Sequence, residues 1–504
     1  MLTSREPFAK YCSEETFAQI KEYDTVSQMW LHSLKEYADD IAVEDDGKKY
    51  TYAQIEEDIA FFRTLLKDDS GKKQRIGICA KNSYDFVKAY LAVVTLGCCA
   101  VILPPQLDAP TVFGCSMKFS LDKIVYAPDM EESLCVLRSQ RPDFAVVSTS
   151  QTSDEKTDPV IPKGDDPCVV MFTGGTTGKS KGALLSNIAV MQGTVNGCYG
   201  LSEIFRQRYL LVLPLSHVFG LIRNLMTALY TGSDLYICRN NKDMFKDIAV
   251  FRPTVLVFVP ALAEMSLMLS KKFGKNMLGD SLKYIIAGAA SVSPYLIKEY
   301  QSQLGVTILP GYGLTESANL VSGNPESLKK PDSVGIPFPN QDIKIVDGEL
   351  LLKGKNMMAG YIGEDESDIY TEDGYFRTGD LARFDDEGFL YITGRIKEII
   401  VLSNGENVSP AELEVRFNRP DFIQDSQVFE DVDENGVHFL SLEVVPRAAI
   451  IAQMGQENPK EYIRKELEKI NLTLEPSQRV QKIVVRDSDF ERTPSMKIKR
   501  YKKC

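Results

Sequence analysis

Residues 173–182 contain the residue types that bind phosphate. Their sequence is Thr-Gly-Gly-Thr-Thr-Gly-Lys-Ser-Lys-Gly, and they directly follow the apolar residues 169–172. This order predicts a strand that runs into a loop. Glycines expose backbone N–H groups to phosphate oxygens, threonines add hydroxyl donors, and lysines supply compensating charge. The segment is therefore a candidate phosphate loop, although a glycine-rich loop alone fits a flexible surface connection equally well.

A Walker A loop, G-x-x-x-x-G-K-[ST], is the first alternative for this segment. Gly178, Lys179 and Ser180 fit its end, but Thr173 occupies the position of its first glycine. The mismatch argues against a conventional P-loop nucleoside triphosphatase, which would hydrolyse ATP to ADP without needing an acid.

A second cluster, residues 310–316, reads Pro-Gly-Tyr-Gly-Leu-Thr-Glu. Its glycines let the backbone approach a ligand closely and leave the face of the Tyr312 ring open for stacking on a base. Thr315 and Glu316 offer oxygen atoms to phosphate and to Mg2+, a hard cation that prefers oxygen ligands. A tight turn with a structural role alone is the competing interpretation.

Two later clusters carry further charged residues. Thr378-Gly379-Asp380 is followed by Gly394-Arg395-Ile396-Lys397, and Lys497 lies in the basic C-terminal segment. An aspartate on a turn is usually a cap or a turn former, and a basic C-terminus is usually a solvated end.

The four clusters, in this order and at these separations, resemble the motifs of adenylate-forming enzymes. This family includes acyl-CoA synthetases, the adenylation domains of peptide synthetases and beetle luciferases. The loop departs from the family's Thr-Ser-Gly-Thr-Thr-Gly-x-Pro-Lys-Gly at Gly174 and Ser180, and Met496 stands where the family usually has glycine before its catalytic lysine. The resemblance extends from about residue 169 to residue 500. The N-terminal third shares only the general pattern of apolar runs and helical segments.

The resemblance implies that the chain binds ATP and Mg2+. Tyr312 would stack on adenine, Thr315 would meet the α-phosphate, Glu316 would hold the magnesium ion, and Asp380 would bind the ribose hydroxyls with Arg395 nearby. The nucleotide-binding residues that it implies are Thr173, Gly174, Gly175, Thr176, Thr177, Gly178, Lys181, Gly288, Ala289, Tyr312, Gly313, Asp380 and Arg395.

The resemblance also implies a reaction in two halves. A carboxylate attacks the α-phosphorus of ATP, with Lys497 as the catalytic lysine, and the C-terminal domain then rotates about Lys397. Gly405 and Glu406 belong to the loop that enters the site for attack by a thiol. We therefore expect an N-terminal domain over residues 1–394 and a mobile C-terminal domain over residues 395–504.

The segment around His217 is the best indication of the substrate. Residues 213–220, Leu-Pro-Leu-Ser-His-Val-Phe-Gly, resemble the Pro-Leu-x-His-x-x-Gly of fatty-acyl and aryl-CoA synthetases, although a lone histidine is more often structural. The resemblance implies that His217 borders the acyl site and the thiol tunnel and is a catalytic residue together with Lys497, Thr315 and Glu316. Relatives that activate amino acids carry an aspartate in this region, and none occurs here between Leu211 and Thr231. We expect a fatty acid with CoA as acceptor; an aryl acid, or a carrier-protein phosphopantetheine as acceptor, stays open.

Apolar runs and helical patterns alternate through the first four hundred residues. Residues 75–79, 100–103, 209–213, 254–259 and 283–287 read as strands, and residues 52–66 as an amphipathic helix. This alternation predicts an α/β fold with mostly parallel sheets. Short alternating runs from Asp342 predict a small antiparallel or barrel-like subdomain, and the last hundred or so residues predict a separate α+β unit.

Composition excludes several classes of function. Over 504 residues, 58 Lys and Arg against 70 Asp and Glu give a formal net charge of -12, which argues against a nucleic-acid partner. The ten cysteines form no C-x-x-C pair, and three histidines make a zinc site improbable. No signal peptide or transmembrane run is evident, so we expect a cytoplasmic enzyme. A catalytically silent binding protein is the remaining alternative.

Overall fold

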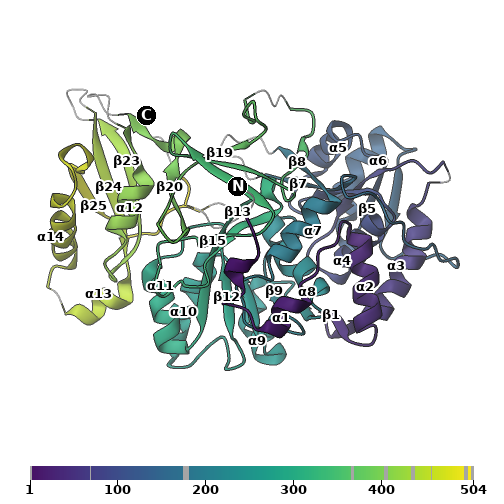
Figure 1. The fold of residues 1–504 in the computed structure, drawn as a ribbon, viewed down its shortest axis with the longest axis horizontal. Coiled ribbons are helices and arrows are strands. Elements are labelled where there is room, and N and C mark those ends of the chain that lie inside the picture. Colours follow the sequence, from purple (N-terminus) through teal and green to yellow (C-terminus); the bar gives the residue numbers. More distant parts are fainter. Residues whose placement is uncertain are drawn as a thin grey trace.

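The computed structural model describes residues 3–68, 70–173, 181–364, 368–401, 407–432, 438–455, 457–492 and 498–500. Two large sheets form most of the molecule, with helices packed against them (Figure 1). A smaller antiparallel sheet and a C-terminal unit complete it. The expected α/β class is confirmed.

The first large sheet has seven strands in the order β18-β8-β7-β4-β3-β5-β6, and its central strands β7, β4, β3, β5 and β6 pair in parallel. Its strands are β3 (Arg75–Cys79), β4 (Cys99–Leu103), β5 (Lys123–Tyr126), β6 (Ala145–Ser148), β7 (Pro167–Phe172), β8 (Gly182–Ser186) and β18 (Gly360–Tyr361). β4 is buried at every position, as expected for a strand covered on both faces.

The second large sheet has nine strands in the order β15-β14-β13-β12-β11-β9-β10-β1-β2. Its strands are β1 (Ile41–Asp45), β2 (Lys48–Thr51), β9 (Arg208–Leu211), β10 (Asp234–Ile237), β11 (Val255–Phe258), β12 (Tyr284–Ala287), β13 (Thr307–Leu314), β14 (Asn319–Gly323) and β15 (Ile336–Pro337). Parallel pairing runs from β1 through β13, and antiparallel strands close both edges.

Helices cover these sheets, and local sequence signals set their ends. The predicted helix over residues 52–66 is α3, which begins after a capping box formed by Thr51 and Gln54. The helices of this part are α1 (Glu14–Gln19), α2 (Val26–Tyr37), α3 (Tyr52–Leu66), α4 (Tyr84–Thr95), α5 (Ala109–Lys118), α6 (Cys135–Gln140), α7 (Asn187–Asn196), α8 (Thr227–Tyr230), α9 (Met244–Phe251), α10 (Pro260–Phe273) and α11 (Pro294–Glu299). A buried π-helix, η3 (Phe219–Met226), precedes α8.

The short alternating runs after residue 341 form a four-stranded antiparallel sheet. Its strands, in spatial order, are β16 (Gln341–Val346), β17 (Glu349–Gly354), β19 (Phe376–Phe384) and β20 (Leu390–Arg395). β19 extends along the upper edge of the molecule in Figure 1. Register pairs Asp380 of β19 with Arg395 of β20.

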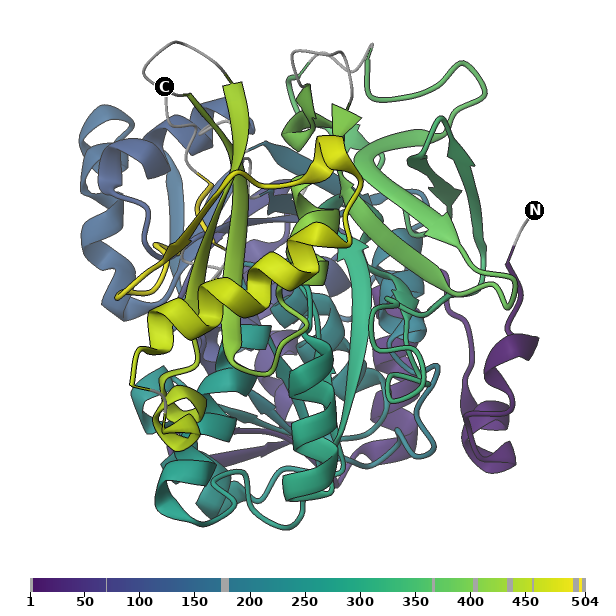
Figure 2. The same ribbon diagram turned by 90° about the vertical axis from the view of Figure 1, so that its left-hand side faces the viewer.

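The C-terminal unit has a hydrophobic core of its own, formed by residues between Val408 and Val485. Its helices and strands are β21 (Ile400–Val401), β22 (Asn407–Val408), α12 (Pro410–Phe417), β23 (Ile423–Val432), β24 (His438–Pro446), α13 (Ala448–Met454), α14 (Pro459–Leu472) and β25 (Lys482–Val485). Figure 2 shows α14 crossing the three-stranded sheet β23-β24-β25. This unit contains both helices and strands, as expected for an α+β unit, while the boundary at residue 394 stays a prediction.

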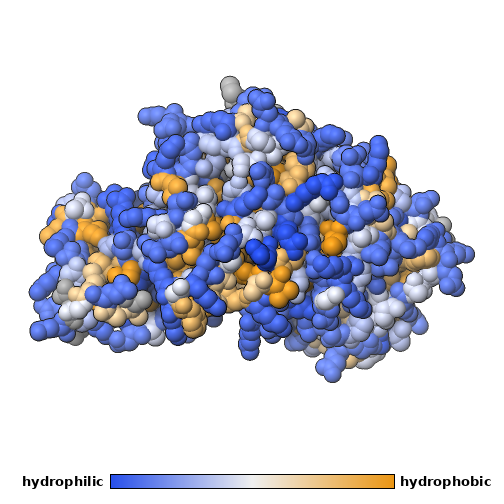
Figure 3. All heavy atoms as spheres, turned by 90° about the horizontal axis from the view of Figure 1, so that it is seen from below, coloured by the Kyte–Doolittle hydropathy of each residue, from blue (hydrophilic) through white to orange (hydrophobic). Residues whose placement is uncertain are grey.

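The face of the molecule drawn in Figure 3 is mainly polar. On the face drawn in Figure 3, apolar residues form separate patches among hydrophilic ones. The most exposed large apolar side chain is that of Val250, at 73%. Within the described residues, no helix has both the length and the apolar character needed to cross a membrane.

Candidate active site

The predicted phosphate loop connects two paired strands. β7 and β8 are antiparallel neighbours, and the Thr173 N–H donates to the Lys181 carbonyl at 2.9 Å, so these two residues close the hairpin at the base of the loop. Residues 174–180 lie outside the described part of the chain. The predicted site residues Gly174, Gly175, Thr176, Thr177 and Gly178 fall there, as do Gly405, Glu406 and Lys497 elsewhere in the chain.

Tyr312, Asp380 and Arg395 form one hydrogen-bonded chain. The Tyr312 hydroxyl donates to Asp380 Oδ2 at 2.5 Å, and Arg395 Nε donates to Asp380 Oδ1 at 2.7 Å. The Asp380 side chain is 2% exposed. Burial and the neighbouring Asp380 carboxylate raise the pKa of Tyr312, so its hydroxyl stays protonated and remains a donor. β13 and β19 thereby bring two predicted nucleotide residues together.

Glu316 and Lys181 meet at Tyr361, a residue that the sequence did not single out. Glu316 lies on the short helix η6 (Thr315–Ser317), and its Oε1 accepts a hydrogen bond from the Tyr361 hydroxyl. Lys181 Nζ lies 4.8 Å from the centre of the Tyr361 ring. Pairing of β18 with β8 fixes this arrangement, because Tyr361 lies opposite Ala183. The base of the phosphate loop and the predicted magnesium ligand are thus adjacent.

Asn82 braces the segment that leads to His217. Asn82 Nδ2 donates to the Leu213 carbonyl at 2.9 Å, and Asn82 Oδ1 accepts from the Leu215 N–H at 2.9 Å. Both ends of the side-chain amide are therefore used on one short stretch of backbone. His217 itself is half-buried, and its N–H donates to the Pro214 carbonyl at 3.1 Å.

The small residues after β12 lie against the segment that follows His217. A Cβ on Gly288 would come within 3.2 Å of Phe219 Cζ and 3.5 Å of the Gly311 carbonyl. Any larger residue at position 288 would crowd the ring. Ala289 has a φ of 68°, a left-handed conformation that is uncommon outside glycine. Gly288 thus packs the end of β12 closely against Phe219, just after His217, while Ala289 next to it is exposed.

Ion pairs hold both ends of the segment that carries Lys497. Arg492 Nη2 lies 2.5 Å from Asp425 Oδ2 on the side before it. On the side after it, Arg500 pairs with both carboxylate oxygens of Glu414, at 2.9 and 2.6 Å, and its Nε lies 3.1 Å from Glu398. Glu398 belongs to the helix η7 (Ile396–Glu398), which also contains the predicted hinge residue Lys397. The lysine segment and the hinge are therefore linked through Arg500.

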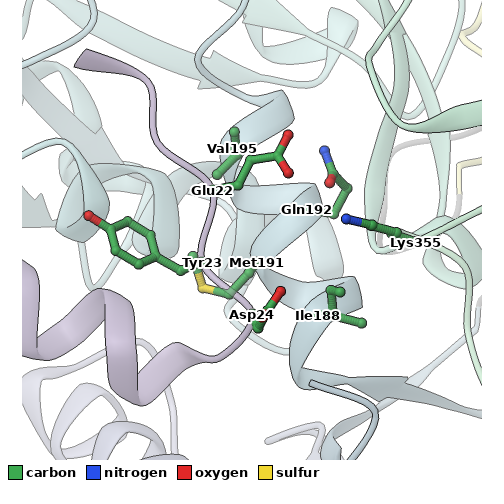
Figure 4. A pocket seen from close by; sticks show the side chains of 8 residues that line it. All are labelled: Glu22, Tyr23, Asp24, Ile188, Met191, Gln192, Val195 and Lys355. Atoms are coloured by element: carbon green, nitrogen blue, oxygen red, sulfur yellow. The ribbon is translucent and has the colours of Figure 1, made fainter. Parts of the chain in front are cut away.

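Two pockets in the described part of the chain are not lined by any predicted site residue. One, of about 10 Å³, lies between Glu22–Asp24 and α7, with Lys355 beside Gln192 (Figure 4). A cavity of this volume holds about one water molecule. The other, of about 380 Å³, is lined by residues of β1 and α4 and by Arg239. The candidate site rests on the side-chain contacts described above.

Comparison with known proteins shows which family and fold this chain shares. A family model for AMP-binding enzymes matches residues 30–362. The long-chain-fatty-acid–CoA ligase of Salmonella typhimurium is 26% identical over 453 residues, covering 78% of this chain and 80% of that protein. The oxalate–CoA ligase of Arabidopsis thaliana is 27% identical over 484 residues, covering 88% and 92%. A solved anthranilate CoA ligase in complex with anthranoyl-AMP has the same fold, with a TM-score of 0.82 at 18% identity and coverage of 96% and 97%.

Proposed function

Because the chain belongs to the AMP-binding enzyme family and is an AMP-forming acyl-CoA synthetase, we propose that its acyl substrate is a fatty acid and its acceptor is CoA. The matched relatives are named for long-chain fatty acids and for oxalate. The segment at residues 213–220 favours an acyl acid over an amino acid, because it offers no aspartate to an ammonium group.

The observation that carries the ATP-dependent part of this proposal is the meeting of Lys181, Tyr361 and Glu316 at the base of the predicted phosphate loop; the choice of acid rests on the segment at residues 213–220. In a bound magnesium–phosphate complex, the Lys181 ammonium can pair with the phosphate oxygens and the Glu316 carboxylate with the Mg2+ ion. Mg2+ is normally held by one or two carboxylates together with substrate phosphates, so Glu316 fits this role.

In the first half-reaction, a carboxylate oxygen attacks the α-phosphorus of ATP and pyrophosphate leaves. The chain supplies position and charge more than acid–base chemistry. Lys497 stabilises charge on the α-phosphate and the carboxylate. Thr176, Thr177 and Lys181 hold the leaving pyrophosphate. Mg2+, when bound beside Glu316, would neutralise part of the phosphate charge.

Tyr312, Asp380 and Arg395 hold the nucleoside. The Tyr312 ring would stack on adenine, and Asp380 would accept the ribose hydroxyls. Both carboxylate oxygens of Asp380 already accept one hydrogen bond, but each oxygen has a second lone pair, so ribose binding needs no loss of Tyr312 or Arg395. Arg395 balances the buried negative charge of Asp380.

In the second half-reaction, the C-terminal domain rotates about Lys397. Lys497 leaves the site, the loop with Gly405 and Glu406 enters, and the thiol of CoA attacks the acyl-adenylate with release of AMP. Rotation must break or remake contacts between the two parts, such as that of Arg447 with Glu264 at 3.2 Å. The proposed domains are residues 1–394 and 395–504.

The test is a panel of fatty and aryl acids incubated with ATP, Mg2+ and CoA, with the thioester identified by mass spectrometry. We expect fatty acyl-CoA and AMP in equal amounts. Formation of aryl-CoA in preference to fatty acyl-CoA would favour an aryl acid as the substrate. Acyl-AMP that accumulates with CoA present, but is transferred to a phosphopantetheinylated carrier protein, would favour the carrier alternative.

A further inference from the structure

Arg223 is a buried charge without a counter-charge among the described residues. It lies in η3, its residue is 1% exposed, and its Nε and Nη1 have no hydrogen-bond partner among the described residues. It takes part in none of the ion pairs formed within that part of the chain. Arginine remains protonated in proteins, so this site cannot be relieved by loss of a proton.

A thiol and a phenol lie near Arg223. Its Cδ lies 3.1 Å from the position that a Cβ on Gly197 would occupy, next to Cys198. Burial raises the pKa of Cys198 to about 12 and that of Tyr209 to about 12, and the Arg223 guanidinium opposes both shifts. The Tyr209 hydroxyl has no hydrogen-bond partner among the described residues. Arg223 thus faces a thiol and a phenol, and neither balances its charge.

Other polar atoms close in the sequence to these residues are also unpaired. Asn196 Nδ2, one residue before Gly197, and Asn224 Oδ1, one residue after Arg223, have no partner within the described chain. A buried polar group without a partner costs free energy, and a buried charge costs more. The buried donors that lack a partner in the described part of the chain, on Asn196 of α7, Tyr209 of β9 and Arg223 of η3, are what a site completed by a ligand would leave unpaired.

The π-helix η3, which carries Arg223, begins next to His217 at the candidate acyl site. η3 begins two residues after His217, and its first residue, Phe219, lies against Gly288. Arg223 follows Phe219 by four residues, about one turn, so the two side chains leave similar faces of the helix. Exposure falls from the half-buried His217 to the 1% exposed Arg223. Extended π-helical geometry is rare and occurs frequently at functional sites.

We propose that Arg223 binds a second carboxylate at the far end of the acyl substrate, which makes the preferred acid an aliphatic dicarboxylic acid. This inference rests on the proposed function and narrows its substrate class. A carboxylate matches the fork of a guanidinium in charge and geometry, and the Tyr209 hydroxyl, close enough to Arg223 for the guanidinium to act on its pKa, is a further hydrogen-bond donor. The methyl end of an ordinary fatty acid would leave the buried charge unpaired.

The proposal is tested by paired acids of equal chain length, each pair consisting of a monocarboxylic acid and its α,ω-dicarboxylic analogue, over short, medium and long chains. Acid-dependent AMP formation gives kcat/KM for each. In the wild-type enzyme we expect the dicarboxylic acid of the best chain length to be preferred by about 10- to 100-fold, as for a hydrogen bond to a charged group. This comparison needs no variant, so it is independent of folding.

The variant Arg223→Met then tests whether Arg223 causes the preference for dicarboxylic acids. We expect the ratio of dicarboxylic to monocarboxylic kcat/KM to fall to about one or below, since methionine keeps the apolar volume without the charge. Arg206→Met is the matched control, because Arg206 is exposed and pairs with Asp40. Its ratio should equal that of the wild type.

Two results would overturn the inference while leaving the proposed function intact. One is a wild-type enzyme that activates the monocarboxylic acids at least as well at every chain length. The other is a folded Arg223→Met enzyme that keeps the wild-type ratio. A wild-type enzyme that forms AMP with no acid of either series would instead overturn the proposed function, and the inference with it.

Discussion

Tyr312 and Asp380, 68 residues apart in the sequence, are joined by a hydrogen bond of 2.5 Å from the phenol hydroxyl to Oδ2. The bond connects the nine-stranded sheet to the small antiparallel sheet. It also connects the residue proposed to stack on adenine to the residue proposed to bind ribose. Arg395 completes the arrangement from the neighbouring strand.

Tyr312→Phe should weaken nucleotide binding while keeping the aromatic ring. Loss of the hydroxyl leaves the buried Asp380 with one donor fewer, at a cost of about 1–3 kcal/mol. We expect the KM for ATP to rise about tenfold with a smaller change in kcat. The KM for ATP and the melting temperature are measured together. An unchanged KM would show that the hydroxyl does not position Asp380 for the nucleotide.

Asn82→Ala should impair use of the acid more than use of ATP. The substitution removes both hydrogen bonds that hold the Leu213–Leu215 backbone before His217. We expect kcat/KM for the acid to fall about tenfold or more, from about 1 kcal/mol for each of the two lost bonds.

Asn82→Asp is the matched variant, because it keeps the acceptor for the Leu215 N–H and loses the donor to the Leu213 carbonyl. An intermediate effect is expected. If the KM values for acid and ATP change equally in both variants, Asn82 has a general structural role and does not position the His217 segment.

Lys497→Ala should separate the two half-reactions. We expect acyl-AMP formation to fall by about 100-fold or more, as for a removed donor to developing charge, while attack of CoA on supplied acyl-AMP is largely retained. Lys499→Ala is the control, since Lys499 is exposed and its nearest carboxylate, Glu491, is 3.6 Å away. Equal loss of both half-reactions in Lys497→Ala would contradict the role assigned to Lys497.

Asp234 should make stability fall as pH rises. Burial and the neighbouring Glu44 raise its pKa to about 7. An unfolded aspartate titrates near pH 4, so the folded state binds the proton more tightly, and the free energy of unfolding decreases between about pH 4 and pH 7. Asp234→Asn should be on the order of 1–3 kcal/mol more stable than the wild type at pH 8 and little different below pH 4.

Urea unfolding of both proteins across this pH range measures the effect. Curves of unfolding free energy against pH that run parallel for Asp234→Asn and the wild type would contradict the assignment. The side chain of Arg208, 3.5 Å from Asp234, is 43% exposed. Loss of this ion pair in Asp234→Asn should therefore change the free energy of unfolding only slightly.

Local sequence signals predicted much of the fold. α3 occupies its predicted range, because helical spacing and the N-terminal cap at Thr51 act within one element. β3 likewise matches its apolar run. The order of strands in the two large sheets was not predictable, because it depends on contacts between segments far apart in the chain.

The same reason explains which site residues were missed. Asn82 and Tyr361 act through partners 131 and 45 residues away, and nothing next to them in the sequence marks those partners. Arg223 did carry a visible signal, a single charge within the otherwise uncharged residues 218–231. Tyr312, Asp380 and Arg395 were predicted by resemblance to family motifs, while their direct contact emerges only from the structure.

The central claim, that this chain activates a carboxylic acid by adenylation, is tested most directly by ATP–pyrophosphate exchange. Purified enzyme is incubated with ATP, Mg2+ and labelled pyrophosphate, with and without an acid, in the absence of CoA. The account predicts that label enters ATP only when an acid is present. Hydrolysis of ATP to ADP that is independent of acid, with no exchange for any acid tested, would contradict it.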